Sequence, residues 1–396
     1  MPSVRRDQRV AMRFIFLMGL VSLLADMTYE GGHSITGPFL SILGAGPAAI
    51  GLVSGLGEFV GYALRLLSGY LADRTRQYWP MTILGYGLNL VAVPLLGLVG
   101  RWEVAAGLVV AERLGKALRT PARDVMLSYA TRRVGTGWGF GLHELMDQIG
   151  AVTGPLLVAS VLYFRAAAYR AAFLTLLAPA GAALAVLLLS RALYPDPRGL
   201  EPEAATDGDN RAERRVPTVL WFYLLFTGFS IAGYAHFQLV SYHFKVQAVV
   251  PEAQIPLLFA LAMGVDALVA LPVGRLFDRR GLATLVLLPL FTLPVPFLVF
   301  SSSYALVLPG VVLWGAAMGV QETVMRAALA EIVPPERRGL AYGLFNAVYG
   351  LSWFLGSTAL GVAYGLGAPY VMLLAGALEV LSLPFLYLLS SSLRRE

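Results

Sequence analysis

Runs of apolar residues recur along the whole chain, and each run ends in a short cluster of glycine, proline or charged residues. The runs are about 20 residues long, the length that a helix needs to cross the hydrocarbon core of a bilayer. Backbone groups in lipid must be bonded within their own segment, so the runs predict helices, and the alternating segments of a membrane barrel are absent. The pattern therefore predicts an all-α polytopic membrane protein with twelve transmembrane helices. The expected ranges are 13–43, 47–72, 79–99, 103–130, 137–163, 169–192, 217–245, 253–277, 282–300, 303–330, 338–364 and 368–392.

A short phrase occurs twice, about half a chain apart. Gly69-Tyr-Leu-Ala-Asp73-Arg74 ends one apolar run, and Gly274-Arg-Leu-Phe-Asp278-Arg279 ends another. Such an echo predicts two pseudo-symmetric six-helix halves, an arrangement typical of proteins that move solutes across a bilayer. The longest polar stretch separates the halves and lacks apolar periodicity, so it is expected to be a cytoplasmic linker. The predicted domains are 1–190, 191–216 and 217–396.

Composition supports this class of protein. Hydrophobic residues make up 57% of the 396 residues and charged residues 14%, whereas a soluble domain has roughly 25% charged residues. The chain has no cysteine, which excludes disulfides, thiolate metal sites and a cysteine nucleophile. Although the net charge is +6, we expect no nucleic-acid partner, because the basic residues cluster in short loops between the spans.

Most arginines outside the spans lie at the ends that are predicted to face one side of the membrane. The opposite ends carry little beyond Arg101, Arg165, Arg170 and Lys245. The positive-inside rule therefore predicts an inner (cytoplasmic) membrane protein with both termini in the cytoplasm. Residues 1–13 are expected to be a cytoplasmic tail and not a cleaved signal. The arginines at the predicted cytoplasmic ends are Arg5, Arg6, Arg74, Arg76, Arg132, Arg133, Arg279, Arg280, Arg337, Arg338, Arg394 and Arg395.

The repeated phrase resembles a motif of the major facilitator superfamily, the loop between the second and third helices, with a fainter copy in the second half. Thr75 stands where a glycine is usual. The resemblance implies that the motif's charges latch helices on the cytoplasmic side. An aspartate at a helix end can also accept bonds from helix N-termini or arginines, and the alternative is a loop charge that only sets topology. The residues assigned to this cytoplasmic gate are Gly69, Asp73, Arg74, Asp278 and Arg279.

The fifth span carries a second motif, G-x8-G-x3-G-P, at Gly141, Gly150, Gly154 and Pro155. It resembles the signature of the drug/proton antiporter branch of the superfamily, although Val158 and Ala159 replace the usual trailing glycine pair. Glycines at these intervals let helices approach closely, and the proline bends its helix. The motif favours an exporter over a symporter, and generic helix packing is the alternative.

Ionisable residues inside the spans are costly and are therefore functional candidates. The first span places Asp26, Glu30 and His33 on one helical stripe. A desolvated carboxylate there could exchange a proton against a solute near neutral pH. The resemblance agrees, because antiporters of the superfamily often keep an acid in the first helix. A hydrogen-bonded polar cluster is the alternative.

The fourth span is rich in charge, with a basic face that includes Arg113 and Lys116. Arg113 matches the family's functional arginine best and is expected in the cavity, where the basic face could neutralise acids of neighbouring helices. Arg123 and Asp124 are expected at the cytoplasmic gate, near the break that Pro121 predicts. Binding of an anionic solute is a third possibility.

The fifth span also contains His143, Glu144 and Asp147. They come within one residue of H-E-x-x-H, but a zinc site needs the second histidine and a further ligand, so no metal site is predicted. We expect Glu144 or Asp147 to pair with the basic fourth helix.

The other cavity candidates are scattered. Glu58 and Arg65 share a face of the second span, and aromatic residues of the eleventh span form a wall that suits an apolar or aromatic solute; lipid-facing aromatics are the alternative. The candidates outside the first, fourth and fifth spans are Glu58, Arg65, His236, Asp266, Glu322, Arg326, Asn346, Tyr349 and Trp353.

Together these features predict a monomeric secondary transporter without cofactors, whose partners are the lipid bilayer, a small solute and protons. The main hypothesis is a proton-coupled exporter of partly apolar organic molecules that works by alternating access. Divalent-metal export, with Asp26, Glu30, His33 and His236 as ligands, is an alternative, and organic-anion transport is another. An intramembrane enzyme is disfavoured because G-x-S-x-G and H-E-x-x-H are both missing, and no nucleotide-binding P-loop motif is present.

Overall fold

The computed structural model describes residues 2–200, 218–333 and 338–393. Most of the predicted linker (201–216) and the loop and tail arginines Arg337, Arg394 and Arg395 lie outside these residues. No strand occurs in the described parts of the chain. The long helices are α1 (Pro2–Ile42), α2 (Pro47–Thr75), α3 (Tyr78–Leu95), α4 (Trp102–Val134), α5 (Thr136–Phe164), α7 (Leu177–Leu193), α8 (Thr218–Gly233), α10 (Ile255–Arg280), α13 (Tyr304–Val320), α15 (Arg338–Leu366) and α16 (Ala368–Leu393). The shorter helices are α6 (Tyr169–Thr175), α9 (Phe237–Val246), α11 (Leu287–Thr292), α12 (Val295–Val299) and α14 (Arg326–Ile332).

The all-α polytopic fold is confirmed. Each expected span coincides with one or more of the described helices. Where a span consists of two helices, a short turn or irregular segment joins them, or, between α13 and α14, the π-helical turn Gln321–Met325. Nine helical stretches within the described residues are long and apolar enough to cross a membrane, and one of them, 252–299, contains two expected spans. Helix α4 falls short of that standard because ionisable residues recur along it from Glu112 to Arg133.

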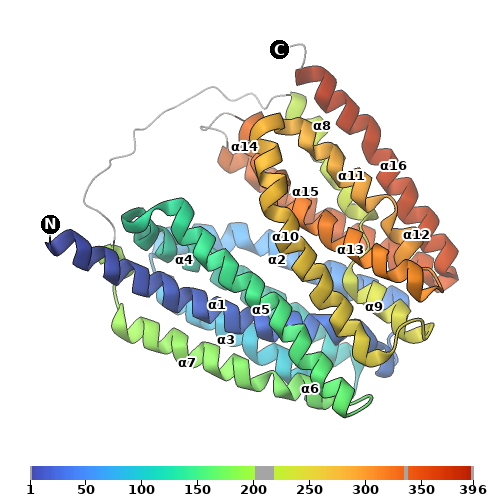
Figure 1. Ribbon diagram of the computed structural model, residues 1–396, viewed down its shortest axis with the longest axis horizontal. Coiled ribbons are helices and arrows are strands. Elements are labelled where there is room, and N and C mark those ends of the chain that lie inside the picture. Colours follow the sequence, from blue (N-terminus) through green and yellow to red (C-terminus); the bar gives the residue numbers. More distant parts are fainter. Residues whose placement is uncertain (1, 201–217, 334–337, 394–396) are drawn as a thin grey trace. The chain divides into compact units, whose positions relative to one another are not determined.

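The chain divides into two compact units. The first comprises Met1–His33 and Ala63–Gly208, and the second comprises Ser34–Tyr62 and Asp209–Glu396. Helices α1 and α2 are each divided between the units. In Figure 1 the first unit contains most of the dark blue helix α1 and the helices α3 to α7 up to green, and the second contains α8 to α16 in yellow-green to red.

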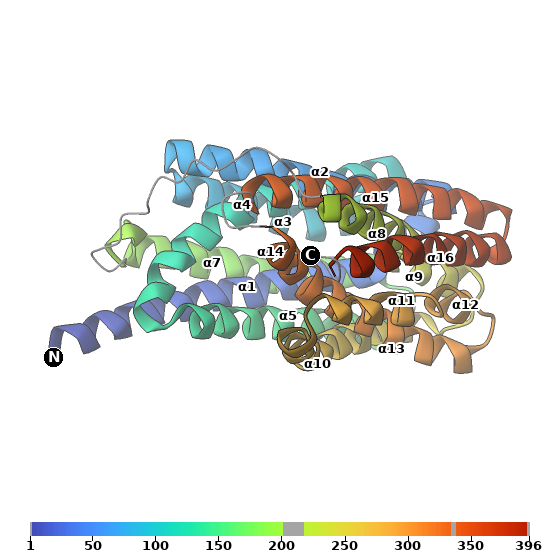
Figure 2. The same cartoon turned by 90° about the horizontal axis from the view of Figure 1, so that it is seen from above.

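The first unit is built around the paired helices α3 and α4. A Cβ atom added at Gly115 would lie 2.5 Å from the backbone nitrogen of Asn89, so only glycine permits this crossing. Apolar side chains of α1, α3, α4 and α7 fill the space around the pair, including Phe14, Tyr86 and Leu187, which are fully buried. Helix α1 runs beside α5 in both views (Figures 1 and 2). This packing brings charged stripes of α1, α4 and α5 together.

The second unit has an aromatic core. Tyr234 stacks on Trp314 with ring centroids 5.2 Å apart, and Phe237 meets the same indole edge-on at 5.4 Å. Aromatic pairs of this geometry add to the stability that burial gives. Helix α13 therefore anchors the connection between α8 and α9.

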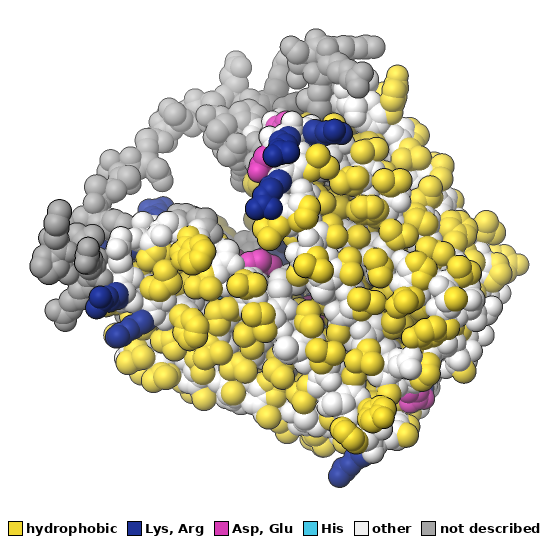
Figure 3. Space-filling view, viewed as in Figure 1, with side chains coloured by type: hydrophobic (Ala, Val, Ile, Leu, Met, Phe, Trp, Pro, Cys, Tyr) yellow, Lys and Arg dark blue, Asp and Glu magenta, His cyan; other side chains and the backbone are white. Residues whose placement is uncertain are grey.

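Hydrophobic side chains cover much of the face of the molecule that Figure 3 shows. Few basic or acidic groups lie among them. Leu66, Leu268 and Leu373 are each at least 65% exposed. A soluble protein rarely exposes so much contiguous apolar surface, whereas lipid-facing helices require it.

Candidate functional site

Ionisable side chains of α1, α4 and α5 meet inside the first unit. Helix α1 is continuous through the stripe that carries Asp26, Glu30 and His33, so its 3.6-residue period points all three to one side. The 33-residue helix α4 supplies the opposing cations over several turns. Charges in such a position persist only when they are paired or hydrogen-bonded.

At one level of this network, His33 lies between Arg113 and Glu30. A guanidinium nitrogen of Arg113 lies 3.0 Å from His33 Nδ1, and Glu30 Oε2 lies 4.0 Å from the same atom. Arginine always carries its protons, so it donates and Nδ1 accepts, which places the proton of a neutral imidazole on Nε2. Arg113 also pairs with Glu112 at 3.4 Å, and Glu112 accepts a 2.7 Å bond from Asn89.

At the next level, Asp26 faces the basic side of α4. Its Oδ1 lies 3.9 Å from a guanidinium nitrogen of Arg119, a pair too long to be a hydrogen bond. Arg119 is 1% exposed, and its guanidinium carbon sits 4.2 Å from the ring centroid of Tyr86. Its Nε and Nη1 have no hydrogen-bond partner among the described residues. One turn away, Lys116 donates to the hydroxyl of Tyr29 and lies over that ring.

Ser22 links the third level. Its hydroxyl lies 2.9 Å from His143 Nε2 and 3.2 Å from the hydroxyl of Tyr86, and Arg123 donates to it at 3.1 Å. His143 Nδ1 lies 3.5 Å from Asp147 Oδ2. These contacts join α1, α3, α4 and α5 in one chain of polar groups, which could transmit a change at one carboxylate to its neighbours.

Arg123 also pairs with its own neighbour, Asp124, at 2.9 Å. The pair lies on the exposed side of the network, because the side chain of Asp124 is 45% exposed. The gate role assigned to these two residues stays a prediction.

Two glycines of α5 permit the close approach of α1. A Cβ atom at Gly150 would lie 2.2 Å from the carbonyl oxygen of Leu23, and one at Gly154 would lie 2.2 Å from that of Met27. Leu23 and Met27 lie on either side of Asp26 in the sequence, so this contact sets the position of the α1 backbone that carries Asp26. Gly141, the first glycine of the motif, has open space around it, and Pro155 lies inside the continuous helix α5.

Several predicted site residues lie elsewhere. Glu144 is exposed and accepts a 3.3 Å bond from Gln148, one turn along α5. The charges of the repeated phrase are exposed at the ends of α2 and α10, where Arg74 donates to Tyr70 at 3.2 Å. Gly69 faces Pro121 of α4. The exposed charges of the phrase are Asp73, Arg74, Asp278 and Arg279.

The second unit contains a smaller polar group. His236 Nε2 lies 3.5 Å from Glu58 Oε1, and the ring of Trp353 meets the imidazole edge-on with centroids 5.1 Å apart. Ser54 donates to the side-chain oxygen of Gln238 nearby. Glu58 and Arg65, which share a face in the sequence, fall into different units.

The remaining second-half candidates have different surroundings. Asp266 is 3% exposed and Tyr349 8%, and the hydroxyl of Tyr349 lies 3.5 Å from Gln321 Oε1. Asn346 is half-buried, whereas Glu322 and Arg326 are exposed. Glu322 lies in the π-helical turn, and such turns frequently occur at functional sites.

The sequence did not reveal that the expected seventh span is broken. Helix α8 ends at Gly233 and α9 begins at Phe237, with His236 as the N-cap, whose Nδ1 accepts from the backbone of Gln238. Trp314 bridges the break. Its indole donates to the backbone carbonyl of Ala235 at 2.9 Å, and its own backbone carbonyl accepts from the hydroxyl of Tyr234 at 2.7 Å. A backbone break in a membrane is tolerated only when its polar groups are satisfied in this way.

We predict that Trp314→Phe destabilises the second unit by about 1–3 kcal/mol, because it leaves the buried carbonyl of Ala235 without its donor. Thermal unfolding of the purified protein in detergent measures this loss. The matched control is Trp221→Phe, since Trp221 is 50% exposed on α8, and a surface change of this kind stays within about 0.5 kcal/mol. Equal melting temperatures for the two variants would contradict the bridging role.

The chain matches a known protein family. The family model described as Major Facilitator Superfamily matches residues 15–357 and 246–395, which together span nearly the whole chain. The chain belongs to the Major Facilitator Superfamily. It is thus a multi-pass membrane protein and a secondary transporter of this type.

Relatives and solved structures agree with that assignment. Uncharacterized proteins of Mycobacterium tuberculosis and Mycobacterium bovis are each 42% identical over 379 residues, covering 95% of this chain and 93% of theirs. An uncharacterized MFS-type transporter of Methanocaldococcus jannaschii is 26% identical over 391 residues, covering 95% of this chain and 94% of its own.

Among solved structures, a mutant of the nucleoside transporter NupG has a TM-score of 0.76 at 12% identity, covering 96% of this chain and 99% of its own. A POT family transporter in complex with 5-aminolevulinic acid has a TM-score of 0.75 at 13% identity, covering 95% and 96%. At such low sequence identity, these structural similarities show that the chain has the same fold, and they do not indicate which solute it transports.

Proposed function

We propose that this superfamily transporter exchanges protons for a small, partly apolar organic solute, exporting the solute by alternating access. Asp26 is the proton-carrying group, and Glu30, His33 and Arg113 tune it through the neighbouring level of the network. The observation that carries the proposal is the loose pair between Asp26 and Arg119, with the guanidinium held against the ring of Tyr86.

The loose pair supports proton exchange for a simple electrostatic reason. A carboxylate that makes a tight two-point bond to arginine is held in its charged form. A carboxylate 3.9 Å from the guanidinium, as here, gives up less electrostatic stabilisation when it takes up a proton. When Asp26 is protonated and no longer attracts Arg119, the ring of Tyr86 still stabilises the guanidinium. Asp26 can therefore alternate between two states without leaving Arg119 unsupported.

Burial favours a proton at this position over an anionic solute. Arg119 is 1% exposed, so no solute reaches its unpartnered nitrogens without moving a helix. Asp26 is 9% exposed, and a proton needs only a transient water path. Arg119 therefore gives the organic-anion alternative no support.

The aromatic groups of the second unit support an apolar or aromatic solute. Trp353 contacts both His236 and Tyr234, and Tyr62 lies 4.7 Å from Tyr349 between ring centroids. Aromatic faces with a few polar groups are typical of small-molecule sites. The export direction rests on the resemblance of the α5 glycine motif to that of antiporters.

Metal export receives no comparable support. Within the described residues, no three His, Asp or Glu side chains are placed to hold a metal ion. Of the four suggested ligands, Asp26, Glu30 and His33 belong to the first unit and His236 to the second.

The test uses purified protein in liposomes that contain a pH-sensitive dye. After a proton gradient is imposed, lipophilic cations, organic anions and Mn²⁺ are added in turn. We expect proton movement when a lipophilic organic solute is added. Proton movement with Mn²⁺ alone would favour the metal alternative, and solute transport without any proton movement would contradict the proposal.

A further inference from the structure

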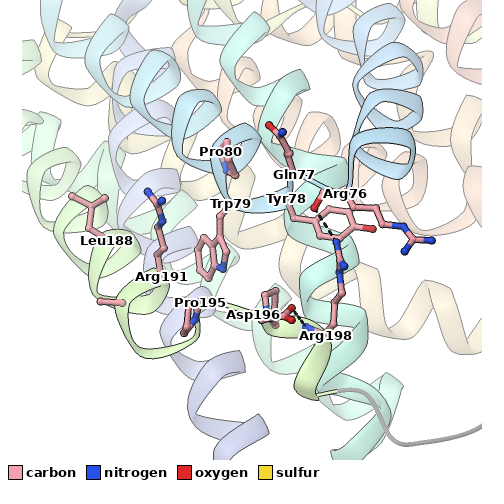
Figure 4. A pocket seen from close by; sticks show the side chains of 12 residues that line it. Arg76, Gln77, Tyr78, Trp79, Pro80, Leu188, Arg191, Pro195, Asp196 and Arg198 are labelled. Atoms are coloured by element: carbon pink, nitrogen blue, oxygen red, sulfur yellow. Dashed lines mark hydrogen bonds between the residues drawn. The ribbon is translucent and has the colours of Figure 1, made fainter.

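A basic cavity lies at one end of the first unit, away from the Asp26 network. Its volume is about 690 Å³, and it is formed where the loop before α3 meets the end of α7 and the turn that follows. Figure 4 shows Trp79 between Arg191 and Arg198, with Asp196 beside the latter. The side chain of Arg76 also lines the cavity but points away from the other labelled residues (Figure 4).

Among the described residues, the three arginines that line this cavity are balanced only in part, by Asp196. Asp196 accepts a 3.1 Å bond from the backbone nitrogen of Arg198 and makes no ion pair with a described guanidinium. Arg198 donates to the backbone carbonyl of Arg76 at 3.2 Å, which holds its guanidinium in place. Arg191 has neither a hydrogen bond nor an ion pair to another described residue. Two arginines with unused donors, one of them fixed, are suited to a phosphate group.

The aromatic wall of the cavity is rigid. The Trp79 indole donates to the carbonyl of Tyr194 at 2.9 Å, and the guanidinium of Arg198 lies 5.8 Å from the ring centroid of Tyr78. Both aromatic residues begin α3, whose N-cap, Gln77, makes no side-chain capping bond. The partial positive charge of the helix end therefore adds to that of the arginines.

The rim of the cavity indicates which phosphate compound binds. Leu188 lines the cavity and is 53% exposed, and the exposed apolar face of α7 continues from it through Leu189 and Leu193. Tryptophan and tyrosine at helix ends are typical of the depth where lipid headgroups lie. A lipid could thus place its phosphate at Arg191 and Arg198 and its acyl chains along α7.

We propose that this cavity binds the phosphate diester of an anionic phospholipid. Basic pockets between the ends of transmembrane helices are suited to such headgroups. The shared chemistry is a phosphate ester, and a soluble sugar or glycerol phosphate is the other source to be tested. The inference is independent of the solute that the transporter moves.

The experiment measures lipid binding to the delipidated full-length protein by native mass spectrometry. The probes are phosphatidylglycerol and phosphatidylcholine with the same acyl chains, together with glycerol 3-phosphate. We expect phosphatidylglycerol to bind more tightly than phosphatidylcholine. The double variant Arg191→Gln/Arg198→Gln should bind phosphatidylglycerol about 10- to 30-fold more weakly, as expected for two charges at an anionic headgroup.

Two further variants separate a binding site from general charge effects. Arg165→Gln/Arg170→Gln removes the same charge from two exposed positions at the other end of the unit, one in the loop after α5 and one in α6, and should keep the lipid preference. Arg191→Lys/Arg198→Lys keeps the charge and should retain most of the preference, which also controls for folding. Equal binding of the two lipids, or equal losses in both glutamine variants, would overturn the proposal. Glycerol 3-phosphate binding as tightly as the lipid would overturn the lipid assignment in favour of a soluble phosphate.

Discussion

Asp26→Asn is expected to abolish proton-driven transport while leaving solute exchange intact. The amide has the shape of the carboxyl group and keeps an oxygen facing Arg119, but it cannot take up and release a proton. We expect the gradient-driven rate to fall about 100-fold, the usual size of an effect when a proton-transferring group is removed. Counterflow of labelled solute without a proton gradient should continue, because that assay requires movement of the solute alone.

Glu103→Gln is the matched control for this variant. Glu103 is an acid at the start of α4 whose side chain is 48% exposed and lies 3.4 Å from Arg101. It therefore lies outside the network, and the Glu103→Gln variant should transport the solute at the wild-type rate. If Asp26→Asn kept gradient-driven transport, another group would have to carry the proton. If it lost counterflow as well, Asp26 would be needed for folding or solute binding and not for coupling alone.

Gly150→Leu is expected to separate α1 from α5 and to prevent stable folding. The added Cβ atom alone would lie 2.2 Å from the carbonyl oxygen of Leu23, which is backbone and cannot swing aside. Overpacking of this kind costs about 3 kcal/mol or more. The yield of monodisperse protein in detergent and its melting temperature measure the effect, and both should fall sharply.

Gly141→Leu provides the comparison on the same helix. Gly141 belongs to the same motif, but nothing lies within 4 Å of its hypothetical side chain. Leucine also favours helix formation more than glycine does, so this variant should be at least as stable as the wild type. Similar losses in the two variants would show that the motif acts through some property other than the contact between α1 and α5.

Much of the fold could be predicted because hydropathy in a bilayer is a strong constraint. All twelve expected spans coincide with described helices, including α4, whose charges weaken its apolar signal. The break between α8 and α9 could not be predicted. It depends on Trp314, which is distant in sequence, and the only local indications are Gly233 and the capping residue His236.

The candidate site could be predicted in part. The helical period placed Asp26, Glu30 and His33 on one stripe, and α4 indeed faces them with its cations. The partners contributed by α3 could not be foreseen, because neither Tyr86 nor Asn89 stands out in an apolar helix. Ser22 precedes Asp26 by one turn, and that spacing is the signal that could have identified it.

Proton release on solute binding would show directly whether Asp26 carries the coupled proton. Purified protein in weakly buffered detergent solution would receive the organic solute identified in the liposome screen, and a pH indicator would record the protons released. We expect the wild type to release protons at a pH where Asp26 is protonated, and we expect Asp26→Asn to release none while still binding the solute. Equal proton release from both proteins, or solute binding to the wild type without any release, would contradict this role of Asp26.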